Sequence, residues 1–286
     1  MMVILMIATS SFSSRKNARI EGKVIGGKKA ERGMFPYVVV VVILFQSADP
    51  NIKGLMCSGS IVTGRWILTA AHCVPNETMT EKKYKVGQVD ERLGYYQNIK
   101  SFTKHPEYRA VLDNGNLLAV YNDICLLYTE DKIEFNNYVG KVCISSTRTM
   151  SGECLVAGFG STNQSYKIQY AFLRYKEIEN KVENSNAFTV DMDGPYPYHG
   201  DSGGPLMCDG KQVGVNSVGY YKRKPIRVFY ENVGAYKDWI VSTVQEDVFD
   251  KCSNEIPTPT KSGQHYKDKP RYLFFYLVFL FSYFKF

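Results

Sequence analysis

The stretch "HGDSGGPLMC", residues 199–208, determines how the whole chain is interpreted. It places the carboxylate of Asp201 beside the hydroxyl of Ser202 and surrounds this pair with glycines and a proline. Glycine leaves the neighbouring backbone N–H groups accessible and permits turns that other residues avoid. The pattern therefore indicates a nucleophilic serine with free space around its oxygen. Such a serine needs a base elsewhere in the chain, because a hydroxyl is a weak nucleophile while it keeps its proton.

One of the four histidines is a candidate for this base. His72 ends the apolar stretch "WILTAAHCV" (66–74), and a neutral imidazole can accept a hydroxyl proton near pH 7. Asp123, in "YNDICLLYTE" (121–130), comes just before an apolar segment. A buried carboxylate there would orient the imidazole and stabilise its charged form. Taken singly, His72 is typical of a structural residue and Asp123 of a turn residue, but together with Ser202 they indicate a catalytic triad.

Strand-like segments dominate the chain between its two ends. The β-branched run "PYVVVVVILF" (36–45) predicts a strand that is buried on both faces. Helical periodicity is clearest in "AYKDWIVSTVQE" (235–246), where Tyr236, Trp239, Ile240 and Val244 share one face. Many strands followed by one closing helix favour an all-β barrel or sandwich. Further strands are expected in four segments: 59–71, 154–161, 211–219 and 227–233.

Six motifs resemble those of the chymotrypsin-like (trypsin-fold) serine proteases: "KVIGG" at 23–27, "LTAAHC" at 68–73, "NDICLL" at 122–127, "AGFG" at 157–160, "HGDSGGP" at 199–205 and "SVG" at 217–219. The resemblance covers roughly residues 24–246. It implies two six-stranded antiparallel β-barrels followed by a C-terminal helix. It also implies a secreted endopeptidase that hydrolyses protein or peptide substrates and has protein inhibitors as further partners.

The resemblance assigns a role to each residue of the triad. His72 would act as general base and acid, Asp123 would orient it, and Ser202 would attack the scissile carbonyl. The backbone N–H groups of Gly200 and Ser202 would form an oxyanion hole, in which each donor is worth about 3 kcal/mol. The runner-up interpretation is a homologue without catalytic activity that binds a partner protein.

The motif "KVIGG" also predicts that the chain is made as an inactive precursor. Cleavage after Lys23 by a trypsin-like protease would free the amino group of Val24. By resemblance, this ammonium would pair with Asp201, the residue before the nucleophile. A buried carboxylate without a partner is costly, so the oxyanion loop should become ordered only after cleavage.

Seven cysteines leave at least one thiol outside intramolecular disulfides. The resemblance pairs Cys57 with Cys73 and Cys154 with Cys208. Cys125 is expected to be a buried free thiol. A bridge between Cys143 and Cys252 is an option, and the alternative is that both are free or linked to a partner. Two cysteine pairs customary in the family are missing, and one of them would have placed a cysteine at Tyr198.

The residues that correspond to the primary specificity pocket differ from the family pattern. By resemblance, Tyr196 forms the pocket floor and Val228 one wall, where a glycine is usual. Ser217, Val218 and Gly219 form the opposite side. These residues predict a narrowed, apolar pocket for small or medium apolar side chains. The alternative is a preference for Lys or Arg, if Asp191 or Asp193 reaches the pocket.

The composition is that of an ordinary globular protein, and its charge gives no support to nucleic-acid binding. Hydrophobic residues make up 44% and charged residues 22% of the chain. Of the formal charge of +7, residues 1–23 carry +3 and residues 263–286 carry +3, which leaves +1 for the middle. The histidines show no metal-ligand spacing, and we expect no metal and no cofactor.

The two ends predict an exported protein. Residues 1–14 resemble a signal peptide, with an ordinary apolar N-terminus as the alternative, and residues 15–23 would be the activation propeptide. Residues 247–286 form a linker and an apolar tail, which would be a removed lipid-anchor signal, a membrane-associated tail or an unstructured end. The disulfide pattern and glycosylation triplets at Asn76 and Asn163 agree with an extracellular location.

Overall fold

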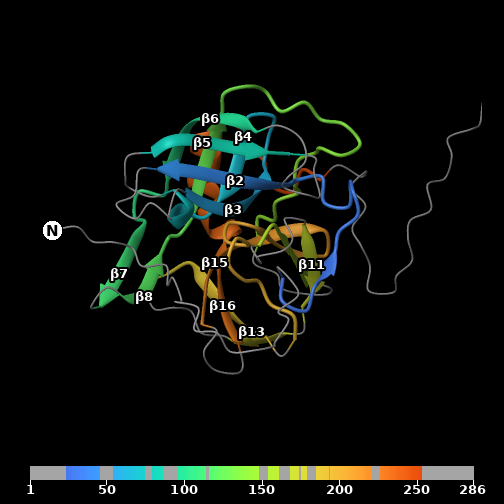
Figure 1. The fold of residues 1–286 in the computed structure, drawn as a ribbon. Helices are drawn as coiled ribbons and strands as arrows, with labels where there is room; N and C mark the ends of the chain where they lie inside the picture. Colours follow the sequence, from blue (N-terminus) through green and yellow to red (C-terminus); the bar gives the residue numbers. More distant parts are fainter. Residues whose placement is uncertain are drawn as a thin grey trace, which may run out of the picture.

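The computed structural model of the protein describes eleven segments of the chain: residues 24–45, 54–74, 79–86, 96–113, 116–147, 154–160, 168–173, 175–178, 185–192, 194–220 and 226–252. The first half of these forms a barrel and the second half a curved sheet (Figure 1). The predicted signal peptide, propeptide and most of the C-terminal tail lie outside the described residues.

The first half is a closed antiparallel barrel in the strand order β2-β3-β4-β9-β6-β5. The run of valines at residues 38–41 is at most 1% exposed, as expected for a strand that packs on both faces. Because the barrel is closed, each of its six strands pairs with two neighbours, and none of them lies at a sheet edge. The strands are β2 (Val38–Phe45), β3 (Gly54–Ile61), β4 (Trp66–Thr69), β5 (Met79–Lys85), β6 (Gln97–Lys104) and β9 (Cys125–Thr129).

The second half is a row of eight strands in the order β1-β11-β10-β14-β15-β16-β13-β12. Strand β11 pairs with β10 near one end of the row and β12 with β13 at the other end, yet only residues 173–174 separate β11 from β12 in the chain. The two strands at opposite ends of the row are therefore close together in the sequence, and counting them as one leaves six strands plus β1 at the edge. The strands are β1 (Lys28–Lys29), β10 (Cys154–Gly158), β11 (Gln169–Phe172), β12 (Tyr175–Ile178), β13 (Ala187–Met192), β14 (Pro205–Cys208), β15 (Lys211–Tyr220) and β16 (Ile226–Asn232).

The predicted helix is present at the C-terminal side, as α1 (Lys237–Val244) preceded by the short helix η2 (Val233–Tyr236). Tyr236, Ile240 and Val244 are buried and join the core of the first barrel. The apolar face predicted for this helix therefore packs against the barrel. No helix among the described residues has the length and apolar character that crossing a membrane requires.

A hairpin that the sequence did not predict projects beside the barrel, formed by β7 (Arg109–Asp113) and β8 (Asn116–Tyr121) (Figure 1). It lies between β6 and Asp123 in the chain, and β8 ends two residues before that aspartate. The hairpin therefore connects the barrel wall to the segment that carries the proposed triad carboxylate.

Three disulfides join Cys57 to Cys73, Cys143 to Cys252 and Cys154 to Cys208. The third links neighbouring strands at a position where Cys154 and Cys208 are register partners in β10 and β14. Cys125 is a buried free thiol. The option of a Cys143–Cys252 bridge, left open by the sequence, is the one found.

Candidate active site

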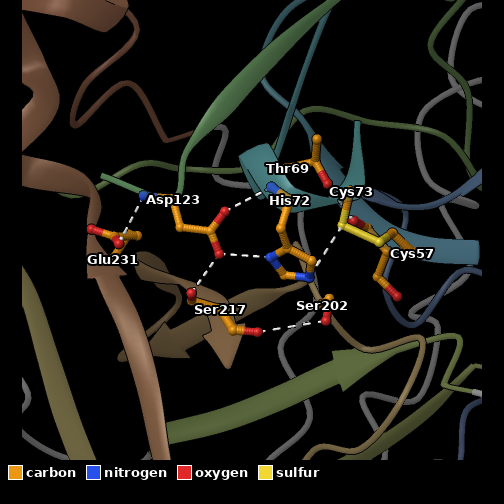
Figure 2. Close-up of polar contacts among 9 residues, drawn as sticks. Cys57, Thr69, His72, Cys73, Asp123, Ser202, Ser217 and Glu231 are labelled. Atoms are coloured by element: carbon orange, nitrogen blue, oxygen red, sulfur yellow. Dashed lines mark hydrogen bonds and ion pairs between the residues drawn. A yellow bond between two sulfur atoms is a disulfide. The ribbon is translucent and has the colours of Figure 1, made fainter. Parts of the chain in front are cut away.

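His72 and Asp123 come together from two adjacent strands of the barrel. His72 lies in the short helix η1 (Ala71–Cys73), just after β4, and Asp123 lies just before β9. Thr69 on β4 pairs with Cys125 on β9, which brings the two strand ends into contact. The His72 backbone N–H donates to Asp123 Oδ1 at 2.8 Å, and His72 Nδ1 lies 2.6 Å from Asp123 Oδ2. Two contacts to one carboxylate fix both the backbone and the ring of the histidine (Figure 2).

The residue before Asp123 helps to turn its carboxylate inward. Asn122 has a φ of +50°, in the left-handed region that asparagine tolerates better than most residues. Its side-chain amide donates to the Glu107 carbonyl at 3.2 Å, which anchors the turn. Asp123 itself is fully buried. The sequence "YND" thus supplies a conformation that an apolar residue at position 122 would resist.

Ser202 lies in the turn before β14, and the next residue, Gly203, has a conformation and a close contact that only glycine accommodates. Gly203 has a φ of +79°, and a Cβ at this position would lie 2.1 Å from Thr69 Oγ1 and 2.4 Å from the Ser58 carbonyl oxygen. The Ser202 carbonyl accepts a hydrogen bond from the Ser58 N–H at 2.8 Å. The serine is therefore held close against strands β3 and β4 of the first barrel.

Ser217, on β15, contacts both Asp123 and Ser202. Its hydroxyl donates to Asp123 Oδ2 at 2.5 Å, and its carbonyl lies 3.5 Å from Ser202 Oγ. Figure 2 shows the Ser202 side chain on the Nε2 side of the His72 ring, away from Asp123. Within the described residues, Ser202 Oγ makes its only hydrogen bond to Ser217 and none to His72. A rotation of this hydroxyl toward Nε2 would complete the proton path from serine to histidine to aspartate.

Burial and charge shift the pKa values of His72 and Asp123 in opposite directions. Burial alone would lower the pKa of His72, but the adjacent Asp123 carboxylate outweighs it and raises that pKa above 6.5. Burial would likewise raise the pKa of Asp123, and the contacts with His72 and Ser217 lower it instead. The pair therefore stabilises the imidazolium that forms when a hydroxyl gives up its proton.

The glycine before Asp201 is held by a serine from the first barrel. Gly200 has a φ of +90°, and its carbonyl accepts a hydrogen bond from Ser58 Oγ at 2.9 Å. The same hydroxyl oxygen accepts from the Phe159 N–H at 2.8 Å. Within the described residues, the N–H groups of Gly200 and Ser202 donate to no other group. Two free donors beside a serine hydroxyl have the chemistry of an oxyanion hole.

Comparison with known proteins identifies the family of this arrangement. The family model described as Trypsin matches residues 24–240. The chain belongs to the trypsin family. It is 27% identical to pig trypsin over 78% of this chain and 96% of that one. It is 29% identical to phenoloxidase-activating factor 3 of Holotrichia diomphalia, over 78% and 73% of the two chains. Among solved structures, HL collagenase matches with a TM-score of 0.65 at 23% identity, covering 78% of this chain and 99% of that one, which shows a shared fold.

Val24, the residue expected to become the new N-terminus after activation, is buried. Val24 is fully buried and Asp201 is 2% exposed. Ile25 and Tyr196 exchange backbone hydrogen bonds of 2.8 and 3.1 Å, which ties this segment to the loop before Ser202. The Asp201 carboxylate accepts from the N–H of Gly160 at 2.7 Å and from that of Tyr198 at 2.9 Å. Lys23 lies outside the described residues.

The residues expected to line the specificity pocket differ in their burial and packing. Val228 is fully buried and pairs with Gly219 on β15 and Val190 on β13. Tyr196 is half-buried and packs against the same apolar cluster. Val218 is half-buried, beside an irregularity in the pairing between β15 and β16. Val228 therefore places a buried isopropyl group at a position where the resemblance predicts a glycine.

The alternative of an acidic pocket is weakened by an ion pair. Arg227 Nε donates to Asp191 Oδ1 at 2.8 Å, and Arg227 Nη2 donates to Asp191 Oδ2 at 3.2 Å. A carboxylate held by both oxygens to a guanidinium is neutralised, so Asp191 is a poor partner for a substrate cation. Asp193 lies outside the described residues, as do Asn76 and Asn163.

Sequence reasoning does not single out two residues that contact Asp123. Ser217 was assigned only to the pocket, yet its side chain bonds Asp123. Glu231 was not singled out, yet its carboxyl contacts the Asp123 backbone. The motif "SVG" could have directed attention to the first, whereas a single glutamate in the segment "RVFYENV" gave no comparable signal.

One cluster of metal-ligating residue types occurs among the described residues, formed by Cys57, His72 and Cys73. Its two sulfurs are bonded to each other, and a disulfide offers no thiolate to a metal. The cluster is therefore the disulfide that flanks the histidine, with Cys73 Sγ 3.9 Å from His72 Nε2.

Proposed function

We propose that this trypsin-family protein is a secreted serine endopeptidase in which Ser202, His72 and Asp123 form the catalytic triad. The observation that carries the proposal is the chain of contacts from Asp123 to His72, with Ser217 bonded to both Asp123 and Ser202. Three side chains from distant parts of the sequence meet there with the chemistry that acyl transfer needs. The substrates are proteins or peptides, as for the family.

The reaction follows from the positions of these groups. His72 Nε2 removes the Ser202 proton as Oγ forms a bond to the scissile carbonyl carbon. The carbonyl oxygen becomes an oxyanion, which the N–H groups of Gly200 and Ser202 stabilise by about 3 kcal/mol each. His72 then gives its proton to the leaving amine as the C–N bond breaks. Water, activated by the same imidazole, hydrolyses the acyl-enzyme and restores the Ser202 hydroxyl.

The raised pKa of His72 determines the pH at which kcat/KM is expected to fall on the acid side. Only the neutral imidazole can accept the serine proton, so kcat/KM should fall on the acid side with a midpoint above pH 6.5. Initial rates on one peptide substrate, measured from about pH 5 to pH 9, determine this midpoint. A midpoint at or below pH 6.5 would contradict the influence assigned to Asp123.

Activation is proposed to follow cleavage after Lys23 by a trypsin-like protease. The new Val24 ammonium would enter the buried region beside Asp201 and pair with that carboxylate. Pairing offsets the desolvation of two buried charges, and it would fix the loop that carries Gly200 and Ser202. This supports an extracellular zymogen whose partners are its substrate, its activating protease and protein inhibitors. Membrane association would require that the apolar tail or a lipid anchor is retained.

The preferred residue on the acyl side of the cleaved bond is proposed to be small or medium and apolar. The proposal is supported by the burial of Val228, by the packing of Tyr196 against the same apolar cluster, and by the pairing of Asp191 with Arg227. A large side chain or a cation would then bind less well than a small apolar one. Trypsin and phenoloxidase-activating factor 3 are relatives by sequence, but the pocket residues here differ from the family pattern. A peptide library cleaved by the processed enzyme reports this preference directly.

Replacing Val228 with glycine should widen the pocket. We expect kcat/KM for substrates with Phe before the cleaved bond to rise about 10- to 100-fold relative to substrates with Ala there, since each added methylene in a pocket is worth about 1–3 kcal/mol. The graded control is Val228→Ala, which should give an intermediate shift. An unchanged ranking of Phe and Ala substrates in both variants would contradict the assignment of Val228 to the pocket wall.

The second candidate is a binding protein without activity. It is favoured by the occupied pocket wall and by the absence of a Ser202–His72 hydrogen bond within the described residues. The two candidates are separated by treating the precursor with immobilised trypsin, removing the trypsin and measuring hydrolysis of an unfolded protein substrate. Hydrolysis by the processed protein but not by an identically treated Ser202→Ala variant supports the protease. No hydrolysis by either supports the binding protein.

A further inference from the structure

A second buried carboxyl group lies directly behind the triad aspartate. Glu231, on β16, is 1% exposed. Its Oε1 accepts a hydrogen bond from the Asp123 backbone N–H at 2.9 Å. Figure 2 shows Glu231 on the side of Asp123 that faces away from His72. The carboxyl therefore contacts the residue that orients the base without touching the reacting atoms.

The other oxygen of Glu231 enters a short chain of polar groups. The Tyr236 hydroxyl lies 2.5 Å from Glu231 Oε2 and 3.1 Å from Asn122 Oδ1. The Asn122 amide nitrogen donates to the Glu107 carbonyl, so Asn122 Oδ1 must accept from Tyr236. Within the described residues, neither Glu231 nor Asn122 has any other side-chain partner. Through Tyr236, these hydrogen bonds thus join Glu231 to Asn122, the neighbour of Asp123.

The number of protons shared by these hydrogen-bonded groups indicates whether the Glu231 carboxyl is protonated. If Glu231 were ionised, the single Tyr236 proton could serve either Glu231 Oε2 or Asn122 Oδ1, and one acceptor would be left buried without a donor. If Glu231 is a carboxylic acid, its O–H donates to the Tyr236 oxygen and Tyr236 donates to Asn122. Every acceptor is then satisfied, and no negative charge lies beside Asp123.

We propose that Glu231 is a positioning residue of the protease, held as a neutral carboxylic acid, which fixes the backbone of Asp123 through its own carbonyl oxygen and through Tyr236 and Asn122. This inference rests on the proposed function, since it assigns a role in orienting the triad. Glu231 is not a catalytic residue, because it touches neither substrate nor the reacting atoms.

The groups around Glu231 agree with a neutral acid. Burial, and next the nearby Asp123 charge, raise its pKa to about 7 against the opposing hydrogen bonds. Its register partners on the adjacent strands, Ala187 on β13 and Val215 on β15, carry no charge. No cation pairs with its carboxyl among the described residues. The groups around the Tyr236 hydroxyl and ring are Asn186, His105 and Trp239.

The state of the carboxyl can be measured without any catalysis. Infrared difference spectra of the processed Ser202→Ala protein, recorded across pH, should show the C=O band of a protonated carboxylic acid that is lost around pH 7. The band should be missing in the protein that also carries Glu231→Gln and present in one that carries Glu134→Gln, a change at an exposed carboxylate. A band that is missing below pH 7 in the Ser202→Ala protein would overturn the neutral acid.

The positioning role is tested by kinetics on the otherwise native enzyme. Glu231→Leu removes the acceptor of the Asp123 N–H, and kcat should fall about 10-fold or more with KM little changed. Glu231→Gln keeps an acceptor and a donor but cannot ionise. It should restore most of the kcat lost in Glu231→Leu, because the amide oxygen can still accept the Asp123 N–H and the amide N–H can still donate to Tyr236.

Three results are distinguishable. A Glu231→Leu protein with native melting temperature and native kcat overturns the positioning role, and so does a Glu231→Gln protein with native melting temperature whose kcat is as low as that of Glu231→Leu. An inactive native enzyme whose carboxylic-acid band is present refutes the protease, and the positioning role with it, while the neutral acid stands. Melting temperatures of each variant, measured in parallel, separate loss of kcat from loss of folding.

Discussion

Replacing Ser202 with alanine is expected to reduce kcat/KM for peptide hydrolysis by about 10⁶-fold, the loss typical of a triad nucleophile. The variant lacks the oxygen that would form the acyl-enzyme. The fold should be unaffected, because among the described residues the lost hydroxyl makes only a long contact of 3.5 Å, to the Ser217 carbonyl. Steady-state rates of the processed variant, with melting temperature in parallel, measure both effects.

The matched control for this change is Ser101→Ala, since Ser101 is exposed on β6. This variant should hydrolyse the same peptide at the native rate. A Ser202→Ala protein that keeps even 1% of native kcat/KM, prepared without residual trypsin, would be incompatible with Ser202 as the nucleophile.

Replacing Lys23 with glutamine is expected to leave the precursor inactive after trypsin treatment. Trypsin cuts after Lys or Arg, so the Val24 amino group would not be released. Val24 and Asp201 are both buried, and without the ammonium the carboxylate lacks its proposed charge partner. N-terminal sequencing of the treated protein and its activity on a peptide substrate are measured together. The native chain should begin at Val24 and be active.

Lys28→Gln and Lys29→Gln are the controls, because both lysines are exposed on β1 a few residues after the cleavage site. Each of these variants should be activated like the native precursor. Full activity in the Lys23→Gln protein, with no chain beginning at Val24, would show that activation does not depend on this new N-terminus.

The contact between His72 and Asp123 and the barrel strands could be predicted because each is indicated by a short, local sequence pattern. The valine run at 38–41 is apolar at every position, which a strand packed on both faces requires, and these residues are indeed buried. Gly203 marks a turn with positive φ and a close approach to Thr69 and Ser58. The face shared by Tyr236, Ile240 and Val244 predicted the helix, and it packs on the barrel core.

Residues whose roles depend on distant partners could not be predicted in this way. Along β16, Val228 and Tyr230 are buried, whereas Arg227 and Phe229 are only partly buried. Continued alternation would leave Glu231 partly exposed, yet it is buried against Asp123, which is 108 residues away. Ser58 likewise supports Gly200 across 142 residues. Nothing in the segments around these two residues indicates either contact.

The second half of the fold was predicted less completely than the first. The sequence predicted a second six-stranded barrel, whereas the described residues form a row of eight strands, in which β11 and β12 are separate and β1 is added at one edge. The β7–β8 hairpin was not predicted, because the segment 103–121 shows no clear alternation that separates it from a surface loop. Strand pairing depends on partners that are remote in sequence, so it is harder to predict than strand existence.

The central claim is that Ser202 becomes a reactive nucleophile once the propeptide is removed. The most direct test is covalent labelling with a fluorophosphonate probe before and after treatment with immobilised trypsin, with the modified residue identified by mass spectrometry of the peptides. We expect labelling of the processed protein at Ser202, little labelling of the precursor and none of the Ser202→Ala variant. A processed protein that begins at Val24 and stays unlabelled, while pig trypsin in a parallel sample is labelled, would contradict the claim.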